Sequence, residues 1–370
     1  IIDFKKNNLH IFSYSKDVNL ILTKNQLLKK IYSLPHLPNA IPYVTSYYKR
    51  NWGFCETYRR KMKIKKKYSK RDKFKVFIQS SFNKKGNMHY GEMIIKGKNK
   101  KEILLSTYIC HPSMANNEIS GILVAVALSN FFLKRKKIPY YTIRVLFIPE
   151  TIGAIAYINK NLKALKKRVI GGYVLSCIGD NRNFSYLNSK YGNSFSDLCA
   201  KETFKKLKIK YKNYSFLSRG SDERQFNSPG IDIPIGSIMR TKYGEYPEYH
   251  TSLDNFNLVT EKGLRGGFHI AKKILENMQT KRNLSIYYRK TKKRHQKNPI
   301  SLVKCEPHLS KRNLYHFINL NKKNLFRKYL DFLQYSDGTN NINNISKIIK
   351  ISLNETLKIQ KILKNKNLIK

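Results

Sequence analysis

The sequence predicts an α/β fold: a mostly parallel β-sheet with helices on both faces, a small β-rich insert and a C-terminal winged helix. Short apolar runs alternate with longer helical patterns between about residues 100 and 275, and helix-length apolar spacing returns in the last 45 residues. Apolar residues make up 41% of the 370 residues and aromatic residues 12%, which is enough to build packed cores. At this length we expect two or three domains.

Three apolar runs predict buried strands, and a helical pattern follows each of them. The strands are expected at 102–109, 140–149 and 169–179, and the helices at 120–136, 151–162 and 195–207. Strands that alternate with helices form parallel sheets, where ligands bind beyond the carboxyl ends of the strands. His111, Glu150 and Asp180 lie at or just past such ends, so they are the first candidates for a site.

The region before these strands interrupts the alternation. Alternating apolar residues at 74–82 and 86–97, separated by the turn sequence NKKG, predict a small antiparallel element. The predicted domains are the N-terminal part of the α/β domain at 1–45, a small inserted domain at 46–98, the rest of the α/β domain at 99–280, a linker at 281–299 and the winged helix at 300–370.

The C-terminal region predicts two short helices joined by a tight turn. Apolar residues recur at helical spacing from Ile342 to Ile349 and from Leu357 to Leu363, and Ser352 and Glu355 form an S-x-x-E capping box before the second helix. This pattern is typical of a winged helix-turn-helix. The recognition-helix candidate at 352–366 contains no arginine, so we expect no sequence-specific reading of DNA.

The chain is strongly basic, with 73 Lys and Arg against 23 Asp and Glu and a formal charge of +50. The lysines are spread through every segment together with abundant Asn, Ile and Tyr, as in proteins from AT-rich genomes. A selected surface for polyanions is the alternative. The densest basic run, at 58–75, is its best candidate, although a solvated face would have the same composition.

Cysteine usage and hydropathy indicate the compartment. The five cysteines form no CxxC pair and their number is odd, so a zinc ribbon or a disulfide framework is not expected and a reducing cytoplasm fits. The sequence contains no run of about 18 apolar residues, so no membrane-spanning helix is expected. The chain begins without methionine, and we expect it to be a fragment.

Six motifs follow one another in the central region: CHPS containing His111, NNEISG at 116–121, PETIG at 149–153, CIGD at 177–180, GSDERQF at 220–226 and YHTSLDN at 249–255. Their order over about residues 100–275 resembles the zinc exopeptidase family of bacterial leucyl aminopeptidases. A closer resemblance covers nearly the whole chain. The stretches 41–55, CHPSMANNE and 220–230 resemble bacterial aminopeptidase-like proteins found with polysaccharide-biosynthesis genes, which carry an inserted small domain and a C-terminal winged helix.

The resemblance implies roles for individual residues. His111 and His250 match the two metal-binding histidines of the family, and Asp180 matches a carboxylate ligand unless the alignment shifts to Cys177. Glu150 matches the general base. Thr151 then takes the place of a ligand glutamate, although a shift of one residue would make Glu150 the ligand.

The position of the metal-bridging aspartate is occupied by Asn117. Two divalent ions about 3.5–4 Å apart repel each other and need anionic bridging ligands. A neutral amide supplies no such charge, so one Zn²⁺ is expected. Further candidates for pocket or supporting positions are Asp222 and Glu223, for which a capped turn is the alternative, and Glu248 and Asp254, which flank His250 and are otherwise solvent-exposed.

The sequence therefore predicts a metal-dependent, aminopeptidase-like hydrolase that acts on an amide or related bond in an envelope or polysaccharide pathway. Two alternatives remain open: a catalytically impaired metal-binding protein, and a DNA-binding regulator that uses the winged helix. We expect a small-molecule or peptide-like substrate and no membrane partner. A homo-oligomer is compatible with the sequence.

Overall fold

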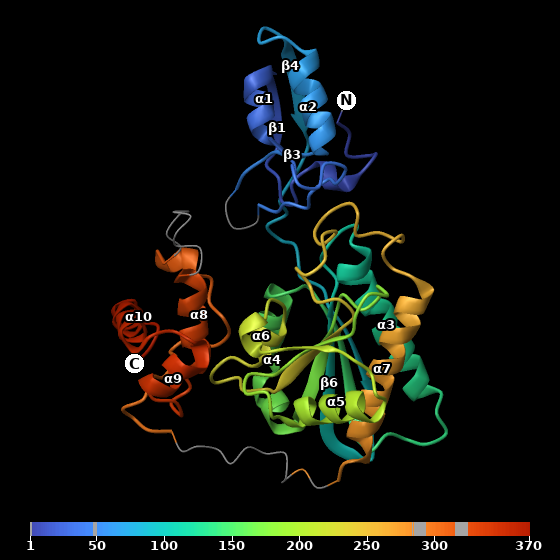
Figure 1. Ribbon diagram of the computed structural model, residues 1–370, viewed down its shortest axis with the longest axis vertical. Coiled ribbons are helices and arrows are strands. Elements are labelled where there is room, and N and C mark those ends of the chain that lie inside the picture. The colour runs from blue at the N-terminus through green and yellow to red at the C-terminus, as the bar shows by residue number, and fades with distance from the viewer. Residues whose placement is uncertain (1, 47–49, 283, 285–293, 315–324) are drawn as a thin grey trace.

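The computed structural model describes residues 2–46, 50–282, 284, 294–314 and 325–370. Figure 1 shows an N-terminal lobe above a larger α/β domain, with a helical C-terminal domain beside the latter. The N-terminal lobe contains these elements: η1 (Asn8–His10), β1 (Val18–Thr23), α1 (Lys24–Lys30), β2 (Ile31–Tyr32), β3 (Phe54–Cys55), α2 (Tyr58–Lys67) and β4 (Lys73–Ile78). Its small core includes Val18, Leu27 and Val76.

The α/β domain is built on a seven-stranded sheet with the order β10-β9-β11-β8-β6-β7-β5. Its strands are β5 (Gly91–Ile95), β6 (Asn99–Tyr108), β7 (Tyr141–Ile148), β8 (Val169–Leu175), β9 (Ser185–Leu187), β10 (Lys212–Tyr214) and β11 (Ile235–Met239). Its helices are η2 (Ala115–Ile119), α3 (Ser120–Leu133), α4 (Ile152–Arg168), α5 (Phe195–Lys206), η3 (Phe216–Ser218), α6 (Glu223–Phe226) and α7 (Glu261–Thr280). The three predicted strand–helix pairs are all present.

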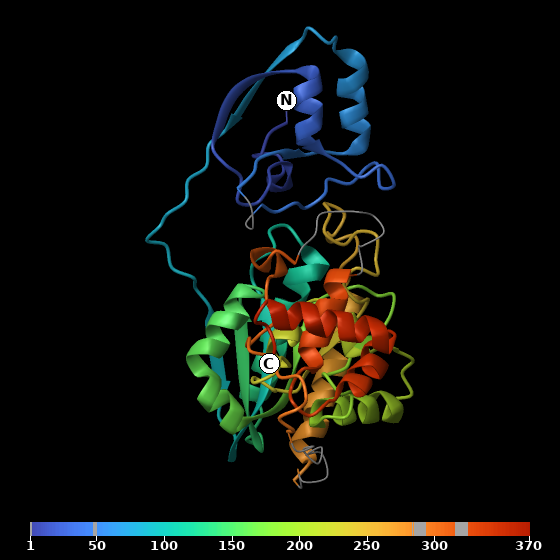
Figure 2. The ribbon, with the colours of Figure 1, turned by 90° about the vertical axis from the view of Figure 1, so that its left-hand side faces the viewer.

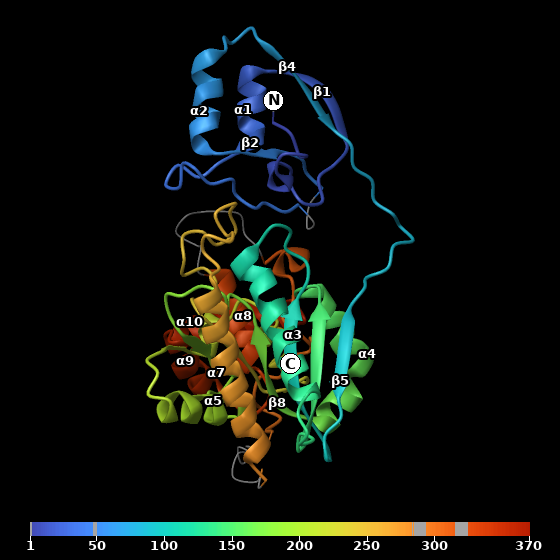
Figure 3. The same cartoon turned by 90° about the vertical axis from the view of Figure 1, so that its right-hand side faces the viewer.

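Helices cover both faces of this sheet, as predicted. Ile103 and Leu105 of β6 point into the cluster formed with α3, α5 and α7, whereas Leu104 points into the cluster formed with α4 and α6. Figure 3 shows α3 and α7 side by side on the first face. The sheet is mixed rather than purely parallel, because β5 runs antiparallel to β7 and β9 antiparallel to β11.

The strand pairing of the N-terminal half differs from the prediction. The segments at 74–82 and 86–97 do not pair with each other: β4 pairs with β1, and β5 joins the main sheet beside β7. The predicted boundary at residue 45 therefore falls inside one folded lobe. An extended connection between β4 and β5 joins this lobe to the α/β domain (Figure 2). Alternation in sequence identified these strands but could not identify their partners.

The C-terminal domain contains η5 (Leu309–Arg312), α8 (Leu325–Tyr335), α9 (Ile342–Ile349) and α10 (Leu353–Asn365). Ser352 caps α10 by accepting a hydrogen bond from the Glu355 amide, which is one half of the predicted capping box. The other half does not form, because the Glu355 carboxylate pairs with Lys328 of α8 at 2.6 Å. The apolar side chains of these helices form one cluster with Phe216 and Met239 of the α/β domain. Part of the predicted linker, residues 283 and 285–293, lies outside the described residues.

One continuous helix, Ala115–Leu133, is long and apolar enough to cross a membrane by length and composition alone. Half of it is buried inside the fold. It begins at the candidate site and packs along the sheet, which is the position of a core helix.

Candidate active site

His111 lies three residues beyond the end of β6, at the edge of the sheet where the sequence predicted a site. Its ring lies 5.3 Å from the ring of His250, measured between centroids, and 5.1 Å from that of Tyr108. The two histidines are 139 positions apart in the chain (250 minus 111) and meet because the loop before α7 returns to this edge.

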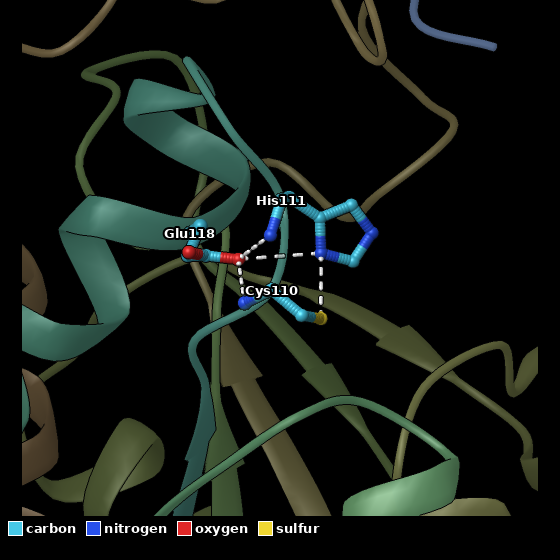
Figure 4. A group of neighbouring side chains, drawn as sticks. All are labelled: Cys110, His111 and Glu118. Atoms are coloured by element: carbon cyan, nitrogen blue, oxygen red, sulfur yellow. Dashed lines mark hydrogen bonds and ion pairs between the residues drawn. The ribbon is translucent and has the colours of Figure 1, made fainter. Parts of the chain in front are cut away.

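Acidic and sulfur atoms lie on both sides of the His111 imidazole. Nδ1 is 3.3 Å from Glu118 Oε2 and 3.3 Å from Cys110 Sγ, while Nε2 is 3.7 Å from Glu150 Oε2. Glu118 also accepts hydrogen bonds from the backbone amides of Cys110 and His111 (Figure 4). Among the described residues, Cys110, His111 and Glu118 form a group whose ligand atoms lie within 4.8 Å of one another.

His250 is held in an environment that keeps it neutral. Its ring stacks on Tyr249 at 3.9 Å between centroids, and its backbone has a φ of 56°. Burial, together with the nearby His111, lowers the pKa of His250 to about 3. Its Nε2 is buried and has no hydrogen-bond partner among the described residues. A neutral imidazole whose buried nitrogen has no hydrogen-bond partner is free to bind a ligand.

Asp180 is fully buried, and its carboxylate is already saturated with hydrogen bonds. It accepts from the amide and hydroxyl of Thr241 at 2.9 and 2.7 Å, from the Asn116 side chain at 3.1 Å and from the Arg182 amide at 2.9 Å. A carboxylate has about four lone-pair sites. No hydrogen bond or ion pair connects Asp180 or its alternative, Cys177, to either histidine in the described part of the chain. These bonds favour a structural role for Asp180.

Asn117 and Asp254 meet at the start of η2. Asp254 accepts hydrogen bonds from the backbone amides of Asn116 and Asn117, so it orients this segment rather than the His250 ring. The Asn117 side-chain amide donates to the Tyr108 hydroxyl, and its Oδ1 has no partner among the described residues. Glu248, the other residue predicted to support His250, instead pairs with Arg182 at 2.7 Å.

A strained turn carries Glu150. Thr151 has φ 61° and ψ −70°, and the Ile152 amide bonds the Glu150 carbonyl at 2.7 Å, which is the geometry of a γ-turn. A positive φ is rare for a β-branched residue and costs about 1–3 kcal/mol, so it persists only where surrounding contacts enforce it. The Asp222 carboxylate accepts a hydrogen bond from the Thr151 amide at 2.7 Å and so helps to hold the turn in this conformation. Burial and the neighbouring Glu150 raise the pKa of Asp222.

Glu223, the other predicted residue of this motif, serves the local fold. Its carboxylate accepts hydrogen bonds from the amides of Gly220 and Ser221 and from the hydroxyls of Ser237 and Tyr243. These contacts join the motif to β11 and leave no free carboxylate oxygen for a ligand. The structure therefore brings together His111, His250, Glu150 and Asp222, whereas Glu223 and Glu248 are engaged elsewhere.

Two family models together match most of this chain. The model of a family described as domain of unknown function DUF4910 matches residues 26–281, and a winged helix-turn-helix model matches residues 298–370. This chain belongs to the DUF4910 family. A candidate polysaccharide biosynthesis protein with an aminopeptidase-like domain, from Clostridium acetobutylicum, is 37% identical to it over 347 residues, which cover 92% of this chain and 74% of that protein.

Solved structures place the DUF4910 chain on an aminopeptidase-like fold. The crystal structure of a candidate peptidase from Clostridium acetobutylicum superposes with a TM-score of 0.71 at 33% identity, covering 100% of this chain and 79% of the other. A zinc aminopeptidase from Bacillus subtilis, BSAP, shares the fold with a TM-score of 0.51 at 16% identity, covering 72% and 70% of the two chains. The predicted resemblance to aminopeptidase-like proteins and the predicted C-terminal winged helix are thereby confirmed.

Four residues of the DUF4910 site were missed from the sequence: Tyr43, Cys110, Glu118 and Tyr249. Tyr43 comes from the N-terminal lobe and lies 5.6 Å from the His111 ring and 5.3 Å from the His250 ring, measured between centroids. Burial raises its pKa to about 12, so its hydroxyl stays protonated at neutral pH. Cys110 and Glu118 belong to motifs already quoted from the sequence. Because both are of metal-ligand type and Cys110 directly precedes His111, residue type and position could have identified them as candidates.

Proposed function

We propose that this protein is a metal-dependent hydrolase of aminopeptidase architecture, with one Zn²⁺ held by His111 and His250 and a peptide-like or related amide substrate. One observation carries the proposal: the buried Nε2 of His250 has no partner among the described residues, and its ring faces that of His111. The donor set fits zinc, because imidazole nitrogens with carboxylate or thiolate are its usual ligands. Asp180 is left out of this ligand set because its oxygens are occupied.

The expected number of metal ions follows from two positions where the family resemblance implies a carboxylate and this chain has none. Asn117 stands where a bridging aspartate is expected and donates its amide to Tyr108, and Thr151 supplies only a hydroxyl. Without bridging negative charge, the repulsion between two divalent ions is not offset. One ion is therefore proposed.

Chemical roles follow for the residues of the chain. A bound Zn²⁺ would polarise a substrate carbonyl and lower the pKa of a water molecule. Glu150 approaches Nε2 of His111 to 3.7 Å and is positioned to accept a proton from that water and to return it to the leaving amine. The rings of Tyr43 and Tyr249 flank His250 and restrict the access of bulk water.

A second candidate function is metal-dependent binding without hydrolysis. The altered carboxylate positions at Asn117 and Thr151 favour it, because they remove ligands that a two-metal hydrolase uses. The relation of the Clostridium acetobutylicum protein to polysaccharide biosynthesis suggests the same pathway class for this chain in either case. A cytoplasmic location remains part of the proposal.

Zinc stoichiometry tests the proposal. Elemental analysis should give about one zinc per chain for the native protein, near zero for His111→Ala and His250→Ala, and more than one for Asn117→Asp, which restores a bridging carboxylate. His269→Ala, on the outer face of α7, is the matched control and should retain zinc. Full zinc retention by His111→Ala, or two zincs in the native protein, would refute the proposed site.

Cobalt substitution decides which side of His111 holds the ion. Ligation by Cys110 would add an intense near-ultraviolet sulfur-to-cobalt absorption, whereas a site formed by His111 and His250 without a thiolate would not. We expect no such band, and an unchanged spectrum in Cys110→Ser. A screen with amino-acid arylamides alongside separates the hydrolase from the binding protein.

A further inference from the structure

The C-terminal domain is attached to the α/β domain through a buried cluster of charges. Arg219, which precedes α6, is almost fully buried and contacts Glu306 at 2.7 Å and Asp331 of α8 at 2.5 Å. The Glu306 amide also donates to Gln225 of α6 at 2.8 Å. Breaking one member of such a cluster leaves a charge buried without its partner.

The same cluster reaches the active site through Arg224. Its guanidinium lies 3.7 Å from Glu306 Oε1 and donates a 2.6 Å hydrogen bond to the Thr151 hydroxyl. Gln334 of α8 donates to the Arg224 carbonyl at 3.1 Å and to Glu306 at 3.0 Å. Arg224 is thus held by two residues of the C-terminal domain while it bonds the residue next to Glu150.

The contact with Arg224 stabilises the backbone conformation of Thr151. Its backbone is in the strained γ-turn described above, and such a conformation persists only when surrounding contacts enforce it. Two side-chain contacts do so: the Asp222 carboxylate accepts from its amide and the Arg224 guanidinium donates to its hydroxyl. Both come from the motif that the C-terminal domain covers.

We infer that Glu306 is a positioning residue for the active site: through Arg224 it holds the Thr151 turn and thereby the backbone that carries Glu150. The winged helix is on this account a fixed part of the framework of the site, in addition to any partner it binds. The role of Glu150 rests on the proposed function, whereas the effect on the turn does not.

Hydrogen exchange on the full chain tests this inference. In Glu306→Gln the amides of residues 150–153 should exchange at least about tenfold faster, since loss of the buried ion pair with Arg224 opens the turn more often. Asp337→Asn is the matched control, because it breaks the 3.3 Å pair with Lys190 at the same domain interface but has no contact with Arg224. Its amides at 150–153 should exchange as in the native protein. Equal acceleration in both variants, or in neither, would overturn the inference.

Substitutions at Thr151 provide a second test should Glu306→Gln fail to fold. Thr151→Val removes only the acceptor for Arg224 and should accelerate exchange at 150–153, whereas Thr151→Ser keeps the hydroxyl and should restore the native rate. If Thr151→Val and Thr151→Ser behave alike, the Arg224 contact does not hold the turn. Zinc content measured on the same samples separates the two claims: its absence from all of them would contradict the proposed function and leave the exchange result standing.

Discussion

At the scale of single residues, hydrogen bonding distinguishes candidates that look alike in the sequence. His250 and Asp180 are both of ligand type, yet the buried Nε2 of the imidazole has no partner in the described part of the chain, while the buried carboxylate accepts four hydrogen bonds. A buried polar atom without a partner is unfavourable, so a ligand that pairs with it adds stability. The nitrogen without a partner, Nε2 of His250, therefore identifies the proposed binding position, which residue type alone does not.

The saturation of Asp180 leads to a prediction about Asp180→Asn. The variant should lose about 2–4 kcal/mol of unfolding free energy, because an amide cannot accept the four bonds, yet should keep its zinc. Denaturant unfolding and elemental analysis measure the two effects. Asp197→Asn, remote from the site and bonded to Ser189, Ser194 and Tyr186, is the control with a similar expected loss. Zinc loss confined to a folded Asp180→Asn protein would return Asp180 to the ligand set.

At the scale of elements, the close approach of α3 to the sheet brings η2 to the strand ends. Gly121 lies in the first turn of α3, where an added Cβ would be 2.4 Å from the Leu175 carbonyl oxygen and 2.6 Å from the Thr107 hydroxyl. Only a glycine permits this approach. Because Asn117 and Glu118 directly precede α3, the contact also sets their distance from His111.

Gly121→Ala should therefore destabilise the protein by about 2 kcal/mol or more, since the methyl group would push α3 away from backbone atoms that cannot move independently. Val126→Ala, on the exposed face of the same helix, should change stability by less than about 0.5 kcal/mol. Thermal and denaturant unfolding of the two variants provide the measurement. Similar stability of both variants would show that the helix shifts without cost.

At the scale of the whole molecule, the site is assembled from separate parts of the chain. The N-terminal lobe contributes Tyr43, whose amide donates to the His250 carbonyl at 2.8 Å, and a second contact joins Ile41 to Ser252. The C-terminal domain contributes Glu306, which contacts Arg224 beside the Thr151 turn. We expect a lobe that reaches the histidines in this way to limit the size of substrates.

Acid should weaken the attachment of the C-terminal domain. Burial alone would raise the pKa of both carboxyls, but Arg219 and Arg224 lower that of Glu306, and Lys190 lowers that of Asp337, from ordinary values of 4.5 and 3.8. A carboxylate with a lowered folded pKa stabilises the fold above its unfolded pKa, and this stability is lost as the pH falls through the folded pKa. The free energy of unfolding should therefore fall below about pH 4.5.

The comparison with Asp337→Asn isolates this contribution. Because the variant has already lost one of the titrating groups, its unfolding free energy should fall less steeply than that of the native protein below about pH 3.8, the ordinary pKa of the missing carboxyl. Denaturant titrations at a series of pH values measure both slopes. Parallel curves would assign the acid sensitivity to other carboxylates.

The sequence by itself determined the features that depend on local pattern. Buried runs and helical spacing located β6, β7, β8 and the helices after them, and motif order placed His111, Glu150 and His250 near one sheet edge. The capping serine and the isoleucine spacing identified the last two helices. These signals are readable because side-chain periodicity repeats within one element.

Only the tertiary structure decided which distant segments meet. The pairing of β1 with β4, the arrival of Tyr43 beside the histidines, the saturation of Asp180 and the contact of Glu306 with Arg224 all join residues far apart in the chain. Each depends on the packing of whole lobes against one another, which local periodicity does not encode. A residue type shows what a side chain is able to bind, but the partners that folding brings to it decide whether it is free to do so.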